Sequence, residues 1–317
     1  MADVIKTATR DAYGKALVEL GQKNDKVIVF DADLAAATKT GMFKKEFPDR
    51  FIDCGIAESN MMGVAAGMAT AGYTVFASSF AMFAAGRAFE QVRNTIGYPH
   101  LNVKIGATHA GISVGEDGPT HQAIEDIALM RALPGMTIIS PADATESRAA
   151  VQAAIENDGP FYLRFGRLSV PQIFEPSEYK FELGKGIVLS EGTDVTIIAT
   201  GLMVQEAIEA GKILAEKGVS AEVINIHTIK PIDAELITKS AKKTGAVVTA
   251  EEHNIIGGLG SAVAEVLSEN APTPLTRVGI MDKFGKSGKP APLLKMYGLT
   301  AENIAEKALE TIAKKNA

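Results

Sequence analysis

The segment THAGISVGEDGPTHQ, residues 108–122, joins a predicted strand to a predicted helix and decides how the chain is interpreted. The apolar run before it, 103–107, is typical of a buried strand, and residues 123–133 follow a helical pattern. In an open α/β sheet, small ligands bind at loops that follow the carboxyl ends of strands. This glycine-rich segment, hereafter the histidine loop, is therefore predicted to lie at a ligand site.

The polar residues of the histidine loop indicate what kind of ligand it meets. Two of the chain's five histidines, His109 and His121, lie in it together with Glu116 and Asp117. Imidazoles act as general acids, general bases and hydrogen-bond donors near neutral pH. The loop predicts an enzyme that acts on a polar, hydroxyl-rich or phosphorylated substrate.

Short apolar runs alternate with helical patterns along the chain, which predicts parallel sheets with helices on both faces. Strands are expected at 27–30, 51–53, 74–77, 103–106, 136–139, 161–165, 193–199, 221–226 and 246–250, and helices at 57–70, 82–96, 145–157, 204–217, 234–243 and 261–267. The pattern lapses at 171–179, a predicted linker, and Gly218 is expected to end a helix in left-handed geometry. We therefore expect two doubly wound α/β domains, residues 1–175 and 176–317, with their boundary between 170 and 185.

Composition narrows the class of protein. The net charge is −6 and no basic run occurs, which argues against nucleic acid or an anionic membrane as a partner. The single cysteine, Cys54, excludes an internal disulfide and a cysteine-based metal cluster. The first 14 residues lack the apolar core of a signal peptide, and no apolar run reaches membrane-spanning length. A cytoplasmic enzyme or enzyme subunit is expected.

Glu58 begins a helical pattern rich in small residues, and it admits two interpretations. An acid in the first helical turn usually only complements the helix dipole, which we take as the more frequent case. A carboxylate desolvated among small neighbours could instead share a proton with a ligand nitrogen. Phe80 and Phe83, three residues apart, would share a helix face if the helix has begun, either as core packing or as a platform for a flat heterocycle.

The remaining polar candidates also admit structural interpretations. His109 and His121 could be satisfied core histidines, and Arg10, Arg164 and Arg167 could be paired or surface arginines rather than anion clamps. Metal binding at the histidine loop is discounted, because no further histidine or cysteine is nearby in sequence.

The stretch GGLGSAV, 257–263, loosely matches a dinucleotide-binding fingerprint but lacks the third glycine, which would fall at Val263. Six residues also separate the expected strand end from its first glycine. A tight turn at the start of a helix explains the stretch.

Four motifs occur together in one family: ADL at 32–34, GIAE at 55–58, GEDGPTHQ at 115–122 and EEHNIIGGLGSAV at 251–263. With them the chain resembles the C-terminal half of transketolase, the thiamine-diphosphate enzyme that moves two-carbon ketol units between sugar phosphates. The resemblance runs from about residue 10 to the end. It implies a pyrimidine-binding domain followed by a transketolase C-terminal domain, and a role in the pentose phosphate pathway.

The resemblance implies five cofactor-binding residues. Glu58 matches the glutamate that hydrogen-bonds N1′ of the aminopyrimidine, and Phe80 and Phe83 match the aromatics that stack on that ring. Ile56 matches the bulky residue that supports the bent cofactor, and Asp33 matches an aspartate near the thiazolium. The cofactor carries the chemistry and the protein positions it.

The resemblance also implies the substrate-binding residues. His109 and His121, which with Glu58 form the expected catalytic set, match histidines that face the donor sugar's hydroxyls and carbonyl oxygen. Asp117 matches an acid that contacts a substrate hydroxyl. Arg10 and Arg164 match arginines that hold the substrate phosphate, for which the guanidinium fork is well shaped.

Two positions depart from the family pattern. A serine that assists phosphate binding is replaced by Ala37, so that either Thr38 or Thr40 compensates or phosphate binding is weaker. A tyrosine that completes the aromatic cradle is replaced by Gly86, which predicts a looser pyrimidine pocket on that side.

The family binds the Mg²⁺ that neutralises the diphosphate through a GDG motif and a downstream Asn, and no GDG occurs here. The resemblance therefore implies that the chain contributes no metal ligand and pairs with a separate N-terminal transketolase subunit that carries the diphosphate domain. Two copies of each, with the present chain dimerising in an α2β2 assembly, would be the smallest symmetric complex.

Other functions remain open from the sequence. Deoxyxylulose-phosphate synthase and the β subunit of 2-oxo-acid dehydrogenases share the scaffold and the glutamate, although the histidine loop favours sugar chemistry. A non-catalytic partner subunit is a further alternative, for which Ala37 and Gly86 are the only indications. A nicotinamide dehydrogenase built on residues 257–263 is not expected.

Overall fold

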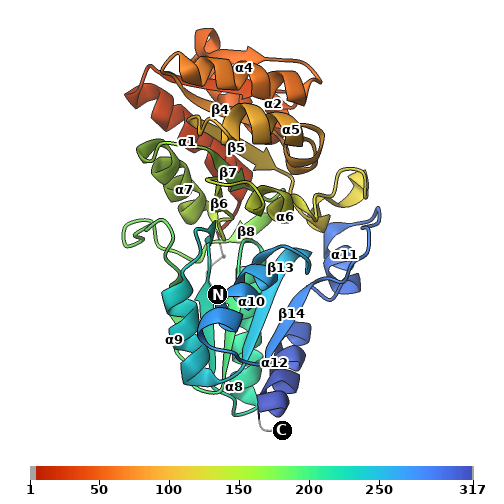
Figure 1. Cartoon of the computed structure of the whole chain (residues 1–317). Coiled ribbons are helices and arrows are strands. Elements are labelled where there is room, and N and C mark those ends of the chain that lie inside the picture. Colours follow the sequence, from red (N-terminus) through yellow and green to blue (C-terminus); the bar gives the residue numbers. More distant parts are fainter. Residues whose placement is uncertain (1–4, 316–317) are drawn as a thin grey trace.

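The computed structural model describes residues 5–315 and confirms the α/β class. Two sheets built mainly of parallel strands lie one above the other, each with helices on both faces (Figure 1). Residues 1–4, part of the stretch searched for a signal peptide, and residues 316–317, the end of the second expected domain, lie outside the described residues.

The upper layer in Figure 1 is a seven-stranded sheet in the order β12-β6-β7-β5-β4-β2-β3. Its strands are β2 (Val27–Asp31), β3 (Phe51–Asp53), β4 (Thr74–Phe80), β5 (Val103–Thr108), β6 (Thr137–Ile139), β7 (Phe161–Arg164) and β12 (Thr228–Lys230). The helices and turns around it are α1 (Thr9–Lys23), α2 (Ala35–Thr38), α3 (Gly41–Glu46), η1 (Pro48–Arg50), α4 (Glu58–Thr70), η2 (Met82–Arg87), α5 (Phe89–Gln91), η3 (Val92–Gly97), η4 (Ile112–Asp117), α6 (Asp126–Arg131) and α7 (Ala144–Glu156).

Strand β2 illustrates why this sheet is covered twice. All five of its residues are buried, and successive side chains point to opposite faces. Val27 and Val29 pack with residues of α1, α3 and α7, whereas Ile28 and Phe30 pack with residues of α4, η2 and α6. The two apolar clusters fix the sheet between two helical layers.

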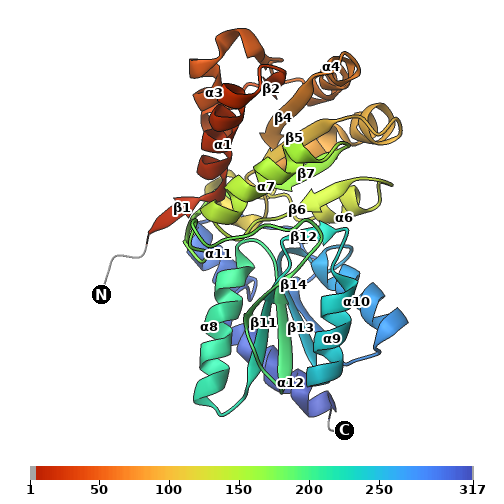
Figure 2. The same cartoon turned by 90° about the vertical axis from the view of Figure 1, so that its left-hand side faces the viewer.

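The lower layer is a five-stranded sheet in the order β14-β13-β10-β11-β9. Its elements are β9 (Ile187–Ser190), β10 (Val195–Ala199), α8 (Met203–Glu216), β11 (Ala221–Asn225), α9 (Ala234–Thr244), β13 (Val247–Asn254), α10 (Leu259–Asn270), β14 (Leu275–Ile280), α11 (Pro290–Met296) and α12 (Ala301–Lys315). Helices α8 and α12 pack together on one face and α9 and α10 on the other (Figure 2). The left-handed geometry predicted for Gly218 is confirmed, with φ at 73°.

The two layers are joined by more than the expected linker. Strand β12, from the C-terminal part of the sequence, pairs antiparallel with β6 and completes the edge of the upper sheet. Strand β8 (Ser169–Pro171), which ends at the first residue of the predicted linker, pairs antiparallel with β1 (Lys6–Ala8). Backbone pairing therefore ties the C-terminal part of the chain directly into the upper sheet.

The helix expected at 82–96 is not a regular α-helix. It is divided into the π-helical turns η2 and η3 with the short α5 between them. Such π turns occur mostly inside helices near functional sites, and their wider spacing shifts side-chain directions. The helix expected at 123–133 is shorter than predicted and begins at Asp126. None of the helices described within residues 5–315 is long and apolar enough to cross a membrane.

Gly106 of β5 and Gly67 of α4 allow a matched test of core packing. A Cβ on Gly106 would lie 2.2 Å from Tyr13 Oη and 2.9 Å from Ser78 Oγ, whereas a Cβ on Gly67 meets no atom within 4 Å. Gly106→Ala should therefore lower the free energy of unfolding by about 1–3 kcal/mol through overpacking. Gly67→Ala should raise it by about 0.5–1 kcal/mol through helix propensity. Urea denaturation of the purified chain measures both, and a Gly106→Ala chain as stable as wild type would contradict the packing described here.

Candidate functional site

The predicted site residues gather at one edge of the upper sheet. Strands β2, β3, β4 and β5 are neighbours and parallel, so their carboxyl ends meet at this edge. Asp33 follows β2, Glu58 starts α4 after β3, Phe80 ends β4, and the histidine loop follows β5. Residues distant in sequence are thus brought to the edge at which open α/β sheets bind ligands.

Glu58 lies at the first position of α4 with a side chain that is 1% exposed. Its Oε2 accepts a hydrogen bond from Arg87 Nη1 at 2.8 Å, and its Oε1 accepts one from Ser79 Oγ at 3.3 Å. The Arg87 guanidinium also lies over the Phe83 ring, 4.6 Å from its centroid, a cation–π contact. Glu58 is thus a buried carboxylate held by a half-exposed arginine, which goes beyond dipole complementation.

Aromatic rings and imidazoles form one cluster beside this carboxylate. Phe80 and Phe83 stack with centroids 6.0 Å apart and an interplanar angle of 12°. His109 stacks on Phe80 at 3.9 Å, and His121 meets Phe83 edge-on at 5.2 Å. The rings are close without sharing a helix face as expected, because Phe80 still belongs to β4 and only Phe83 lies in the turn η2.

His109 is held as a neutral imidazole. Its side chain is 3% exposed, and Arg10 Nη1 donates to its Nε2 at 3.0 Å. Because arginine cannot accept a hydrogen bond, Nε2 carries no proton, and Nδ1 can donate to Thr108 Oγ1 at 3.0 Å. Burial, with the nearby charges of Arg10 and Arg167, lowers the pKa of His109 to about 3. His109 therefore remains uncharged near neutral pH.

The neighbourhood of Ala37 differs from the expectation. Arg10 Nη1 donates to the Ala37 carbonyl oxygen at 2.8 Å. The hydroxyls of Thr38 and Thr40 are buried and donate to Asp31 Oδ2 at 2.7 and 2.8 Å. Both hydroxyls already serve the Asp31 carboxylate, which favours the other alternative, weaker phosphate binding at Ala37.

Arg164 does not face the site edge as a free anion clamp. Its side chain is 6% exposed, and its Nε and Nη2 donate to Asp126 at 2.8 and 3.2 Å. Nη2 also donates to the Glu252 carbonyl oxygen at 3.0 Å. This placement disagrees with the prediction that Arg164 holds a substrate phosphate, since its guanidinium balances a buried carboxylate.

Arg167, three residues later, has the exposure that Arg164 lacks. Its side chain is 36% exposed, pairs with Glu116 Oε2 at 3.1 Å and donates to the Val114 carbonyl oxygen. Its charge is close enough to lower the pKa of both Arg10 and His109, although burial is the larger cause in each case. Arg10 and Arg167 thus form the positive pair next to the histidine loop.

The remaining predicted residues lie at the rim. Asp33 and Asp117 are exposed, and Asp33 donates its backbone N–H to Asp53 Oδ1 at 3.1 Å. Ile56 is 76% exposed, which is unusual for so apolar a side chain. At Gly86 a Cβ would lie 2.5 Å from Met82 Cε, so the Met82 methyl group fills part of the space next to this glycine.

The turn at 257–263 is closed to a pyrophosphate. The buried Glu251 carboxylate accepts the backbone N–H groups of Leu259 and Gly260, at 2.7 and 2.8 Å, and so occupies the start of α10. This agrees with the interpretation as a tight helix-start turn. Within residues 5–315, no group of three or more His, Cys, Asp or Glu side chains is arranged to hold a metal ion.

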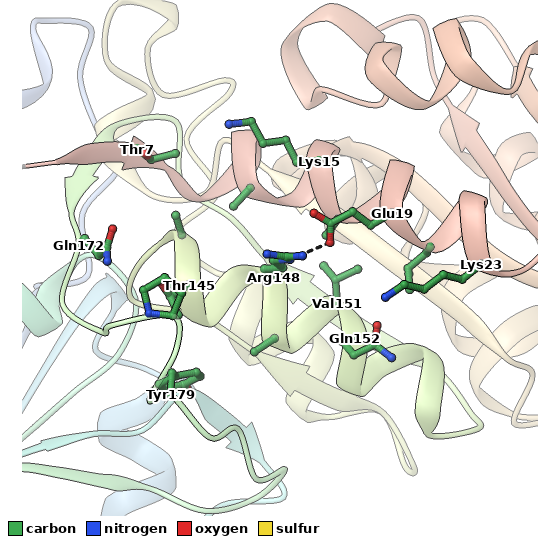
Figure 3. Close-up of a pocket in the computed structure, with 16 residues that line it drawn as sticks. Thr7, Lys15, Glu19, Lys23, Thr145, Arg148, Val151, Gln152, Gln172 and Tyr179 are labelled. Carbon is green, nitrogen blue, oxygen red and sulfur yellow. Dashed lines mark hydrogen bonds and ion pairs between the residues drawn. The ribbon is translucent and has the colours of Figure 1, made fainter.

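A cleft of about 530 Å³ lies elsewhere, between α1 and α7 (Figure 3). Both polar and apolar side chains line it, and Arg148 pairs across it with Glu19 at 2.7 Å. None of the predicted site residues lines it, and these helices cover the sheet face opposite to α4. The cleft is separate from the candidate site.

Family models match nearly the whole chain. The transketolase pyrimidine-binding domain matches residues 5–172, and the transketolase C-terminal domain matches residues 184–304.

Several known proteins are similar to the chain over almost its full length. A putative transketolase C-terminal section from Methanocaldococcus jannaschii is 54% identical, over 96% of both chains. A 6-deoxy-6-sulfo-D-fructose transketolase subunit from Clostridium sp. is 47% identical, over 97% of this chain and 95% of that one. A solved split-gene transketolase, described as an inactive β4 tetramer, superposes with a TM-score of 0.91 at 57% identity, over 97% and 99% of the two chains. Human transketolase is 38% identical over 98% of this chain, which spans 50% of the human protein.

Arg164 and Arg167 should differ sharply when replaced by methionine. Arg164→Met leaves the Asp126 carboxylate buried without its cation, so the free energy of unfolding should fall by about 3–5 kcal/mol. Arg167→Met removes a half-exposed pair and should change it by less than about 1 kcal/mol. Urea denaturation of the two purified variants checks this, and equal stabilities would contradict the assignment of Arg164 to the protein interior.

Proposed function

The chain belongs to the transketolase family, and we propose that it is one subunit of a two-chain transketolase. The enzyme transfers two-carbon ketol units from a ketose phosphate to an aldose phosphate. We assign residues 1–175 to the pyrimidine-binding domain and residues 176–317 to the C-terminal domain. The observation that carries the proposal is the Glu58 carboxylate, 1% exposed, beside the cluster of Phe80, Phe83, His109 and His121.

The residues fit the cofactor of the family, thiamine diphosphate. Glu58 offers a buried acceptor that can hold a proton at a pyrimidine nitrogen. Phe83, backed by Phe80 in a stacked pair, is the aromatic ring on which we expect a flat heterocycle to pack. Ile56 and Asp33, exposed at the same edge, are the further residues that we assign to cofactor binding. When bound, thiamine diphosphate supplies the carbon nucleophile that attacks the ketose carbonyl.

In the free chain Arg87 is the charged partner of the buried Glu58 side chain. Its guanidinium pairs with Glu58 at 2.8 Å and covers the Phe83 ring. A buried carboxylate without such a partner would destabilise the fold. The arginine therefore orients the Glu58 carboxylate in the free chain.

The histidine loop supplies the contacts to the sugar. His109, neutral and hydrogen-bonded to Arg10, and His121, half-buried at the other end of the loop, can exchange hydrogen bonds with hydroxyl and carbonyl oxygens. Asp117, exposed between them, can accept a hydrogen bond from a substrate hydroxyl. For the phosphate we propose Arg10 and Arg167, because the charge of Arg164 is already balanced by Asp126.

We propose that a separate N-terminal subunit completes the site. Relatives of the same length include a transketolase C-terminal section and a split-gene transketolase, which supports this division. In the family a GDG motif and a downstream Asn bind the Mg²⁺ that holds the diphosphate, so we place the metal ligands on the partner. Two copies of each chain would form a cytoplasmic α2β2 enzyme of the pentose phosphate pathway.

Glu58→Gln tests the proposal in the assembled enzyme. The chain is co-purified with the product of a neighbouring reading frame that carries GDG and a downstream Asn, and is assayed with thiamine diphosphate, Mg²⁺, xylulose phosphate and ribose phosphate. Because proton transfer at the pocket acid is lost, kcat should fall by about 10²–10⁴-fold. The exposed Glu269→Gln in α10 is the matched control and should leave kcat unchanged.

Three results would contradict the proposed function. Robust ketol transfer by the chain alone would contradict the two-chain enzyme, and an active Glu58→Gln complex would contradict the role of the acid. Turnover of pyruvate with glyceraldehyde phosphate in place of the sugar pair would indicate a deoxyxylulose-phosphate synthase.

6-Deoxy-6-sulfofructose belongs among the donors tested, because one relative is named for it.

A further inference from the structure

The histidine loop follows a strand of the upper sheet, yet it packs against the C-terminal part of the chain. Ile112, fully buried, belongs to the apolar cluster that contains Val278 and Ile280 of β14. Gln122 Nε2 donates to the Lys286 carbonyl oxygen at 2.9 Å. The loop that carries the candidate substrate residues thus has its apolar anchor in the lower layer.

The side chain of Glu252 adds a hydrogen bond to these contacts. Glu252, near the end of β13 and 4% exposed, accepts the Ser113 backbone N–H on Oε1 at 2.6 Å. Gly111, with φ at 82°, passes so close that a Cβ there would lie 2.2 Å from Glu252 Cδ. Burial raises the pKa of Glu252, and the charge of Arg164 opposes that rise. The loop backbone and the carboxylate are therefore fitted to each other.

We propose that Glu252 is a positioning residue for the substrate. By binding the backbone at Ser113 it holds the histidine loop, and so fixes the positions of His109 and His121 within that loop. This inference rests on the proposed function, because positioning matters only if the loop meets the sugar. The bond is short and buried, and a hydrogen bond is stronger in such a low-dielectric interior than in water. It assigns a task to the C-terminal domain in the reaction, although this domain supplies none of the candidate contacting residues.

The anchor is tested first without any assay of activity. Hydrogen exchange of peptides that cover residues 109–122 is compared in the purified wild-type, Glu252→Ala, Glu252→Gln and Glu251→Ala chains. Loss of the Ser113 partner in Glu252→Ala should speed exchange in the loop by about 10- to 100-fold. Glu252→Gln keeps an acceptor oxygen and should restore most of the protection.

Glu251→Ala is the matched control, because Glu251 is the adjacent buried carboxylate on the same strand. It binds the start of α10 rather than the loop, so exchange should rise near Leu259 and Gly260 and not at 109–122. If Glu252→Ala does not fold, Gly111→Ala serves instead, since its methyl group would push the loop off an intact carboxylate.

The second arm uses the complex assembled with its partner chain and xylulose phosphate as donor. Glu252→Ala should raise the KM for the donor by about 10-fold or more while kcat changes less, and Glu252→Gln should return KM toward wild type. Glu251→Ala should leave KM unchanged even if it lowers the melting temperature.

The outcomes separate the two proposals. Faster exchange in the loop together with a raised KM supports the positioning role. Unchanged exchange in Glu252→Ala overturns the anchor, and faster exchange with an unchanged KM overturns its effect on the substrate. A wild-type complex without ketol transfer overturns the proposed function, and the exchange experiment still decides the anchor.

Discussion

The structure depends on one buried ion pair, Asp126 with Arg164. The arginine, at the end of β7, reaches the first residue of α6 with two nitrogens and the carbonyl oxygen of Glu252 in β13 with one of them. Burial opposes the ionisation of Asp126, yet Arg164 lowers the pKa of that carboxyl below its ordinary value. Removing two charges from water is costly, and their attraction offsets that cost together with the hydrogen bonds from Tyr162 to Asp126 and from Arg164 to the Glu252 carbonyl. The same guanidinium thereby links the upper sheet to the lower one.

The candidate site is assembled from residues that lie far apart in the sequence. The buried carboxylate of Glu58 comes from the start of α4, the ring of Phe80 from the end of β4, and His109 from the loop after β5. Parallel strand order brings them to one edge, and the lower layer then holds the loop from behind through Ile112. The candidate site residues belong to the upper sheet, and their positions depend on the upper and the lower sheet together.

Much of this could be predicted from the sequence, because the information is local. Strand–helix alternation, the polar loop after a buried strand and the helix-ending Gly218 are properties of neighbouring residues, and the structure agrees with them. Side-chain partners were not predictable. Arg164 and Arg167 differ in sequence only by position, and what separates them is Asp126, 38 residues away from Arg164. Likewise, nothing near Glu58 indicates that Arg87 will bind it, since the π-helical turn that aims Arg87 is not visible in the apolar pattern.

The pairing of β12 with β6 has a consequence for how the protein can be divided. One edge strand of the upper sheet, β12, lies some fifty residues after the expected domain boundary, within the stretch that otherwise builds the lower sheet. A fragment that ended at that division would leave the β6 margin without its cover, and bare strand margins recruit other chains into aggregates. The upper sheet is accordingly complete only after the chain has been synthesised through Lys230, when part of the lower sheet already exists.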